Sequence, residues 1–211
     1  MLACFLGSIE ILGGLAIQWR KTVRAGAIAL GAVFLTFALF WIPRILAEPL
    51  LYARWGNLFE QSSEVAGALI VYAMAGRRNS GKAPRAAWIG YRIFGVCVIS
   101  FTLEQLIYLS GTASYVPRWI PPGQMFWAVT TTIALALAAI ALLSGRSALS
   151  ASRWLTVMLI GFGVLVWLPA PFADPHKQIN WAGNAQNLGI TAAAWIVADF
   201  LNKNRRAAGA G

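Results

Sequence analysis

The sequence predicts an all-α, polytopic membrane protein of about seven transmembrane helices, arranged as a parallel internal repeat of four-helix units. Three observations lead to this prediction. The 211 residues are 59% hydrophobic and only 11% charged, so there are too few charges to cover a soluble globule. The positive charges stand in short stretches between apolar runs, as in membrane proteins. Finally, a spaced set of Trp and Pro residues occurs twice.

Seven apolar segments approach the length of a membrane span. A spanning helix needs about 20 mostly apolar residues, because each residue rises about 1.5 Å across a hydrocarbon core about 30 Å thick. One such run could be a buried helix of a soluble protein, but seven of them leave no soluble core in which to be buried. In chain order the expected spans are 2–19, 25–42, 57–76, 88–110, 124–144, 153–169 and 184–202.

The Lys and Arg residues orient these spans. Thirteen of the 17 fall on one side of the expected membrane, and the other four are Arg44, Arg54, Arg118 and Lys177. Because cytoplasmic loops carry the excess of positive charge, the larger set is expected in the cytoplasm. The chain is then a multi-pass protein of the inner (plasma) membrane, with its N-terminus outside and its C-terminus inside. The net charge of +10 needs no nucleic-acid partner.

Two related stretches indicate an internal duplication. They are FWIPRILAEPLLYARW at 40–55 and VWLPAPFADPHKQINW at 166–181. Four Trp and Pro identities within fifteen positions are hard to obtain by chance, and all share an offset of 126. The matched pairs are Trp41 and Trp167, Pro43 and Pro169, Pro49 and Pro175, and Trp55 and Trp181.

Both stretches lie on the sparsely charged outer side. Proline removes a backbone donor, so Pro43 and Pro169 are expected to end their helices. A Trp ring is apolar while its N–H seeks a partner, which suits the headgroup boundary. The sequence therefore predicts four interfacial anchors, namely Trp41, Trp55, Trp167 and Trp181.

The offset also divides the chain into two units. Spans one to three correspond to spans five to seven, so the repeat unit has four spans and both copies enter the membrane in the same direction. Residues 1–87 are expected to form an incomplete first unit of three spans and a basic loop. Residues 88–211 form a complete second unit of four spans and a basic tail. Met1 aligns with Trp127, so the first unit is expected to lack its opening helix.

Two further stretches resemble one known family. YVPRWIPPGQMFWAVTTTIALALAAIALLSGRSA at 115–148 places a Val-Pro-x-Trp-Ile-Pro segment before a helix that opens with aromatic residues, and GSIEILGGLAIQWRKTVRAG at 7–26 places Glu before Gly-Gly and a basic turn. These patterns resemble the DoxX-like membrane proteins, although Ala136 stands where the first copy has Glu10. The resemblance implies four-helix units and a subunit associated with a quinone-linked sulfur or thiol redox system.

Three carboxylates fall inside expected spans and are candidate ligand-binding residues. An ionisable group within a bilayer is costly unless it is paired, protonated or facing water. Glu10, Glu64 and Glu104 share a depth in the middle to outer half of the membrane and could converge on an outward-open cavity. Glu10 stands out because Gly13 and Gly14 lie on its face. Alternatively, each acid is neutral and hydrogen-bonded to a neighbouring helix.

Polar residues open two repeat-related helices on the outer side. Asn57, Glu60, Gln61 and Glu64 open one helix, and Asn180, Asn184, Gln186 and Asn187 open its counterpart. Such residues can simply cap helix starts. They could also form a polar vestibule for a quinone headgroup, and on this hypothesis the candidate ligand-binding amides are Asn57, Gln61, Asn184 and Asn187.

The other reactive residues give no catalytic pattern. Cys4 and Cys97 lie in separate apolar segments, so neither a disulfide framework nor a dithiol centre is indicated. His176 is the only histidine, which excludes bis-histidine haem ligation and a His-rich metal site. Asp199 is expected to pair with Lys203 one turn later. No phosphate loop, nucleophile elbow or zinc spacing occurs, so no autonomous enzyme is predicted.

Three functions remain open at this point. The first is an accessory or quinone-interacting subunit beside a membrane redox partner protein, as the resemblance implies. The second is a small-molecule transporter or binding protein, which the duplication and the intramembrane acids favour. The third is a membrane scaffold or chaperone.

Overall fold

The computed structural model describes residues 2–76 and 83–209, with side chains from residue 5 onward, and this part of the chain is helical without any strand. The described part does not include the side chain of Cys4, nor three of the basic residues, Arg77, Arg78 and Lys82. The helices are α1 (Leu2–Ala16), α2 (Val23–Ala47), α3 (Tyr52–Ala75), α4 (Arg85–Ile107), α5 (Leu109–Tyr115), α6 (Gln124–Ser144), α7 (Ala148–Phe162), the π-helix η1 (Gly163–Trp167), α8 (Ala170–Ala173) and α9 (Gln178–Ala208).

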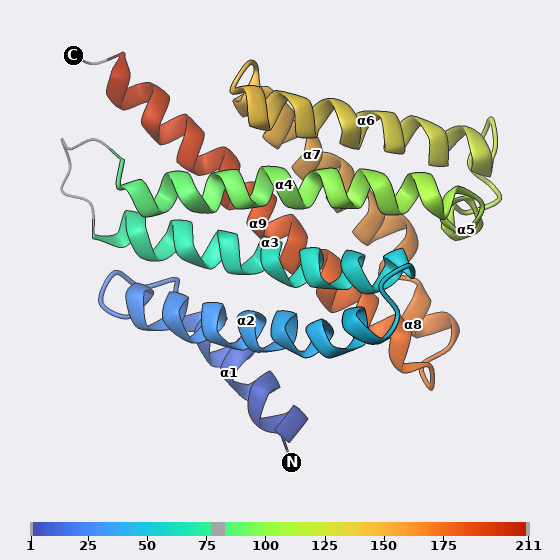
Figure 1. The fold of residues 1–211 in the computed structure, drawn as a ribbon, viewed down its shortest axis with the longest axis horizontal. Helices are drawn as coiled ribbons and strands as arrows, with labels where there is room; N and C mark the ends of the chain where they lie inside the picture. Colours follow the sequence, from blue (N-terminus) through green and yellow to red (C-terminus); the bar gives the residue numbers. More distant parts are fainter. Residues whose placement is uncertain (1, 77–82, 210–211) are drawn as a thin grey trace.

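The long helices form two layers. Helices α2, α3, α4 and α6 lie side by side in chain order, while α9 crosses behind them next to α7 (Figure 1). Helix α9 packs on both α3 and α7, and α1 packs on α2 at the edge of the bundle. The short helices α5 and α8 lie at the end where α3 and α9 begin (Figure 1). Helix α3 is therefore covered by α2, α4 and α9.

Four helical segments are long and apolar enough to cross a membrane. They are Val23–Ala47, Arg85–Ile107, Gln124–Ser144 and Ala148–Ala173, and the shorter apolar helix Phe5–Ala16 accompanies them. The prediction of an all-helical, multi-pass membrane protein is thus confirmed. Helices α3 and α9 are also long enough, but they carry more polar side chains. Because three helices pack on α3, its polar residues Ser63 and Glu64 are buried in protein.

Large apolar side chains face outward along the apolar helices. On α6, for example, Leu137 is 62% exposed and Ile140 65% exposed, one turn apart on the outer face. Exposure of such an apolar surface to water would be unfavourable in free energy, whereas contact with lipid is not.

The core joins the two predicted units. Its largest fully buried side chains include Tyr91 and Phe94 of α4, Leu142 of α6 and Phe200 of α9. Ala66 and Ile70 of α3 belong to the same cluster. Cys97 is a free, buried thiol within this core.

Several expected boundaries were wrong. Pro43 does not end its helix, because α2 continues through it to Ala47. Proline removes one hydrogen bond to the preceding turn and crowds the carbonyl four residues back, but here the helix continues for four residues beyond it. The fourth span ends at Ile107 and is followed by α5. The sixth changes from α-helix to π-helix at Gly163, and Pro169 precedes the four-residue α8.

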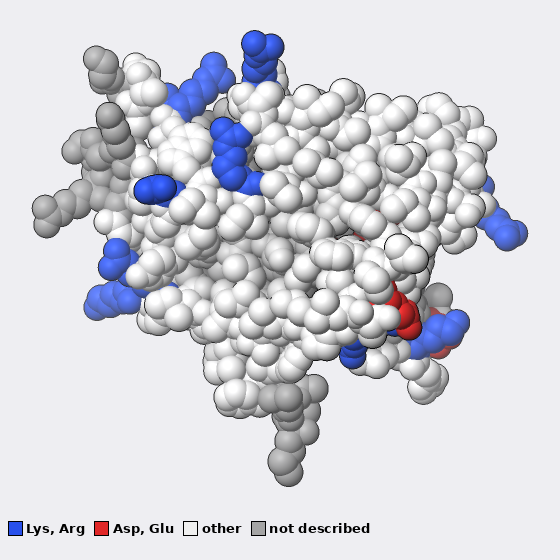
Figure 2. Space-filling model, in the orientation of Figure 1, with Lys and Arg blue, Asp and Glu red and all other residues white. Residues whose placement is uncertain are grey.

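The basic side chains gather at one end of the bundle. On the face shown in Figure 2, most Lys and Arg atoms lie at the end where α2 begins and α3 and α9 finish (Figures 1 and 2). The larger group of visible Asp and Glu atoms lies at the opposite end. The alternation of loops inferred from the sequence therefore matches the two ends of the folded bundle.

Candidate functional site

The contact between α3 and α9 contains buried polar atoms that lack hydrogen-bond partners. Gln61 of α3 donates from Nε2 to Oε1 of Gln186 on α9 over 2.6 Å. The remaining amide atoms, Gln61 Oε1 and Gln186 Nε2, are buried without a hydrogen-bond partner in the described part of the chain. If the O and N atoms of both side-chain amides were exchanged, one hydrogen-bond donor and one acceptor would still be unpaired.

Glu64 lies one turn further along α3. It is only 5% exposed, and its carboxyl lies directly against Gly189 of α9, where any side chain would collide with it. The Glu64 carboxyl lies near enough to the Gln186 amide for a side-chain hydrogen bond. The geometry of that contact is poor, so Oε2 of Glu64 and Nε2 of Gln186 have no well-formed hydrogen bond. We call Gln61, Glu64 and Gln186 the polar seam.

Three further carboxyl groups continue from Glu64. Glu60 on the same helix and Glu10 on α1 lie within electrostatic range of Glu64, and Glu104 on α4 lies within electrostatic range of Glu60. The carboxyl of Glu104 lies against Gly56 of α3, which leaves room for it. We call Glu10, Glu64, Glu60 and Glu104 the acidic row.

The acidic row thus relates the three carboxylates that the sequence singled out. They are linked through Glu60, which the sequence had placed only among helix-opening residues. Within the described residues, no three His, Cys, Asp or Glu side chains come together in a way that could hold a metal ion. The acidic row therefore does not form a metal-binding cluster among the described residues.

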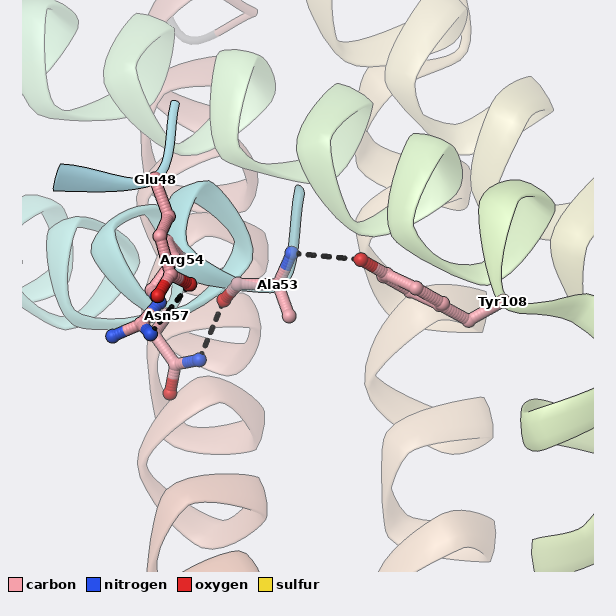
Figure 3. Close-up of polar contacts among 5 residues, drawn as sticks. All are labelled: Glu48, Ala53, Arg54, Asn57 and Tyr108. Carbon is pink, nitrogen blue, oxygen red and sulfur yellow. Dashed lines mark hydrogen bonds and ion pairs between the residues drawn. The ribbon is translucent and has the colours of Figure 1, made fainter. Parts of the chain in front are cut away.

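Asn57 does not join the polar seam. Its Nδ2 donates to the carbonyl of Ala53 in its own helix over 2.6 Å (Figure 3). The same turn is fixed by an ion pair between Arg54 and Glu48 at 2.8 Å and by a hydrogen bond of 3.2 Å from the Ala53 N–H to the Tyr108 hydroxyl (Figure 3). Asn57 therefore helps to build the start of α3.

The two candidate amides of α9 differ in their surroundings. Asn187 is buried, and its Nδ2 donates to the Leu159 carbonyl over 3.2 Å. Leu159 lies near the end of α7, where the helix changes to the π-helix that begins at Gly163. Asn187 thus supports a backbone carbonyl at an irregular point. Asn184 is half-buried and makes no hydrogen bond among those found for the described residues.

The predicted Trp anchors have definite partners. The indole N–H of Trp55 donates to the Pro49 carbonyl over 3.0 Å, and that of Trp181 donates to the Pro175 carbonyl over 3.0 Å. The Arg44 guanidinium lies over the Trp41 ring, 4.7 Å from its centroid. The fourth ring, Trp167, packs on Tyr115 with 5.6 Å between centroids and lies against Gly183.

A third indole contact of the same kind was missed at the sequence level. Trp127 of α6 donates to the Pro121 carbonyl, again over 3.0 Å and again six residues back. In α3, α6 and α9 the Trp is the fourth residue of the helix, and the residue before each helix makes no side-chain cap hydrogen bond. The spacing Pro-x₅-Trp, searched over the whole chain, would have found this third instance.

Comparison with protein-family models, with curated proteins and with solved structures gives no match.

Proposed function

We propose that this protein binds the polar head of a small, largely apolar molecule at the polar seam, with a quinone as the candidate ligand. In this proposal it is a tandem DoxX-like protein that serves a membrane redox system as an accessory subunit. One observation carries the proposal. The seam buries Gln61 Oε1 without a hydrogen-bond partner, and it leaves Gln186 Nε2 and Glu64 Oε2 without a well-formed hydrogen bond in the described structure.

Unpaired buried groups are costly and so invite a ligand. Each costs about 1–3 kcal/mol relative to a paired state. A quinone carbonyl accepts a hydrogen bond, which fits Nε2 of Gln186. A quinol hydroxyl donates one, which fits Oε1 of Gln61 or the Glu64 carboxyl. Glu64 is also able to exchange a proton, which quinone reduction requires, while the electrons come from the redox partner.

The tandem arrangement of seven spans is part of the same proposal. Where α3 meets α9, a Cβ built on Gly67 would lie 3.2 Å from the Cβ of Ala193, and these residues are counterparts at the offset of 126. Equivalent residues meet in this way when two copies of a unit are related by a two-fold axis. Both copies would then run in the same direction, with the basic end in the cytoplasm.

The test is a binding measurement on the purified chain with a short-tailed ubiquinone. The double variant Gln61→Leu, Gln186→Leu removes both unpaired amide atoms and keeps the side-chain size. We expect its quinone affinity to fall about 10- to 100-fold, since one or two hydrogen bonds are lost. Its thermal stability should stay equal to that of the wild type or rise, because a buried polar mismatch is gone.

Asn57→Leu is the matched control, since this amide lies one turn earlier on α3 and is satisfied within its own helix. We expect its affinity to be unchanged. The proposal is wrong if the wild type binds no quinone, or if the double variant binds as tightly as the wild type.

The acidic row supports a second candidate, a proton-coupled transporter. Four carboxyl groups linked by their electrostatic interactions, one of them buried and unpaired, are the kind of arrangement through which protons move in transporters. Its test is proton flux into proteoliposomes, followed with a pH-sensitive dye under an imposed potential. Glu60→Gln should abolish the flux because Glu60 joins Glu64 to Glu104, whereas Glu48→Gln, in the α2–α3 turn, should not. Absence of flux in the wild type would exclude this candidate.

A further inference from the structure

A groove of about 600 Å³ opens at the basic end of the bundle, where α2 begins and α3 and α9 finish. Its apolar walls include Ile70 and Met74 of α3 and Trp195 and Phe200 of α9. This volume falls within the range of about 300–1,000 Å³ that small-ligand sites occupy. The groove is separated from the polar seam by the close contact between Gly67 and Ala193.

Charged side chains line the same groove. They are Arg20 from the α1–α2 turn and the pair Asp199 and Lys203 from α9. Lys203 Nζ lies 2.6 Å from Asp199 Oδ2, which confirms the ion pair expected from the sequence. Arg20 is exposed and has no ion pair among the described residues. The three side chains together carry one net positive charge.

The position of Arg20 is set by its backbone. The Thr22 hydroxyl donates to the Ala16 carbonyl over 2.7 Å, and the Val23 N–H donates to the Trp19 carbonyl over 2.9 Å. These bonds close the turn that carries Arg20.

Arg24, the second residue of α2, already has contacts elsewhere. Its guanidinium lies against Gly76, at the C-terminal end of α3, and 5.8 Å from the centre of the Tyr72 ring. A cation at this place offsets the negative end of the α3 dipole. Of the two cations that line the groove, Arg20 is the one without an ion pair among the described residues.

We propose that this groove binds one anionic phospholipid, with its phosphate at Arg20 and Lys203 and the upper part of its chains along the apolar walls. A cationic rim above an apolar wall matches an amphiphile with an anionic head. Basic pockets between helices on the cytoplasmic side are suited to such heads. Trp195 is 64% exposed beside the groove, as expected for a ring at headgroup depth.

The ion pair between Asp199 and Lys203 predicts whether each substitution strengthens or weakens lipid binding. Asp199 competes with the lipid phosphate for Lys203, so Asp199→Asn should tighten binding while Lys203→Gln weakens it. Arg20→Gln should weaken it as well. We expect a change of about fivefold in each case, equivalent to about 1 kcal/mol for one basic residue near an anionic lipid.

The experiment measures binding of phosphatidylglycerol to the purified full chain in a zwitterionic detergent, by native mass spectrometry and by the shift in the unfolding midpoint. Phosphatidylcholine with the same chains, glycerol phosphate and inorganic phosphate are compared in parallel. The matched control is Asp174→Asn, which removes the partner of Lys177 from an ion pair of 3.1 Å at the other end of the bundle. It changes the net charge by the same amount and should leave binding unchanged.

The expected result is preference for phosphatidylglycerol over phosphatidylcholine, with opposite effects of Asp199→Asn and Lys203→Gln. Equal binding of the two lipids would overturn the proposal. So would equal tightening by Asp199→Asn and Asp174→Asn, which would indicate only a general charge effect. Saturation by inorganic phosphate or glycerol phosphate at the same concentration would show a free-anion site instead of a lipid site.

Discussion

A close contact between α3 and α4 in the core provides a quantitative test of the packing. Gly90 of α4 faces α3, and a Cβ added there would lie 2.8 Å from the Ala66 carbonyl oxygen and 2.9 Å from Cγ1 of Ile70. Ordinary contact begins at 3.4 Å, so Gly90→Ala falls short by roughly 0.6 Å against a backbone atom that no rotamer change can move.

Helices α3 and α4 must therefore separate slightly along an interface that includes the fully buried Ala66 and Ala87. Overpacking of this kind costs about 1–3 kcal/mol. Replacing glycine by alanine inside a helix returns about 0.5–1 kcal/mol. The net expected loss is about 1–2 kcal/mol in the free energy of unfolding.

The assay is equilibrium unfolding of the purified protein in mixed dodecylmaltoside and SDS micelles. Gly161→Ala is the matched control, because a Cβ at Gly161 of α7 has no neighbour within 4 Å. It should be neutral or stabilising. The packing argument fails if Gly90→Ala is as stable as the wild type, or if the two variants lose the same stability.

Three other predictions can be checked with similar means. Trp127→Phe should cost about 1 kcal/mol in the same unfolding assay, because it removes the N–H that donates to Pro121 while keeping an aromatic ring; Trp154→Phe, at a ring that is 73% exposed, should cost little. Asn187→Leu should cost about 1–3 kcal/mol, because the buried Leu159 carbonyl loses its donor; a loss below 0.5 kcal/mol, within about the effect of a surface change, would contradict this. A C-terminal fusion to green fluorescent protein should fluoresce and one to alkaline phosphatase should be inactive, because the proposed orientation puts the basic tail in the cytoplasm; the reverse pattern would overturn that orientation.

Local sequence rules predicted helix identity well and helix ends poorly. The apolar runs at 25–42 and 124–144 correspond to α2 and α6, since length and hydropathy are properties of the segment itself. Pro43 was misread because a proline removes one hydrogen bond and strains the preceding turn without always ending the helix. The π-helical turn at Gly163 was not foreseen, because it depends on neighbours such as Asn187, whose Nδ2 would lie 2.9 Å from a Cβ built there.

The candidate site was predictable only in part. Glu10, Glu64 and Glu104 could be named from the sequence because acids within apolar segments are rare. Their connection through Glu60 could not, because the order of the row depends on which faces of α1, α3 and α4 turn toward one another. The sequence also could not show that Asn57, although an amide like Gln61 and Gln186, hydrogen-bonds within its own helix.

The sequence by itself indicated a lipid environment, an all-helical fold and the clustering of positive charge, because these depend on composition and spacing along the chain. Only the tertiary structure decided which polar groups are left unpaired. Gln61 and Gln186 are 125 residues apart, and neither their contact nor the absence of a second partner is recorded in the residues around them. Hydrogen-bond satisfaction is a property of packed neighbours, and in a bundle those neighbours come from helices distant in the chain.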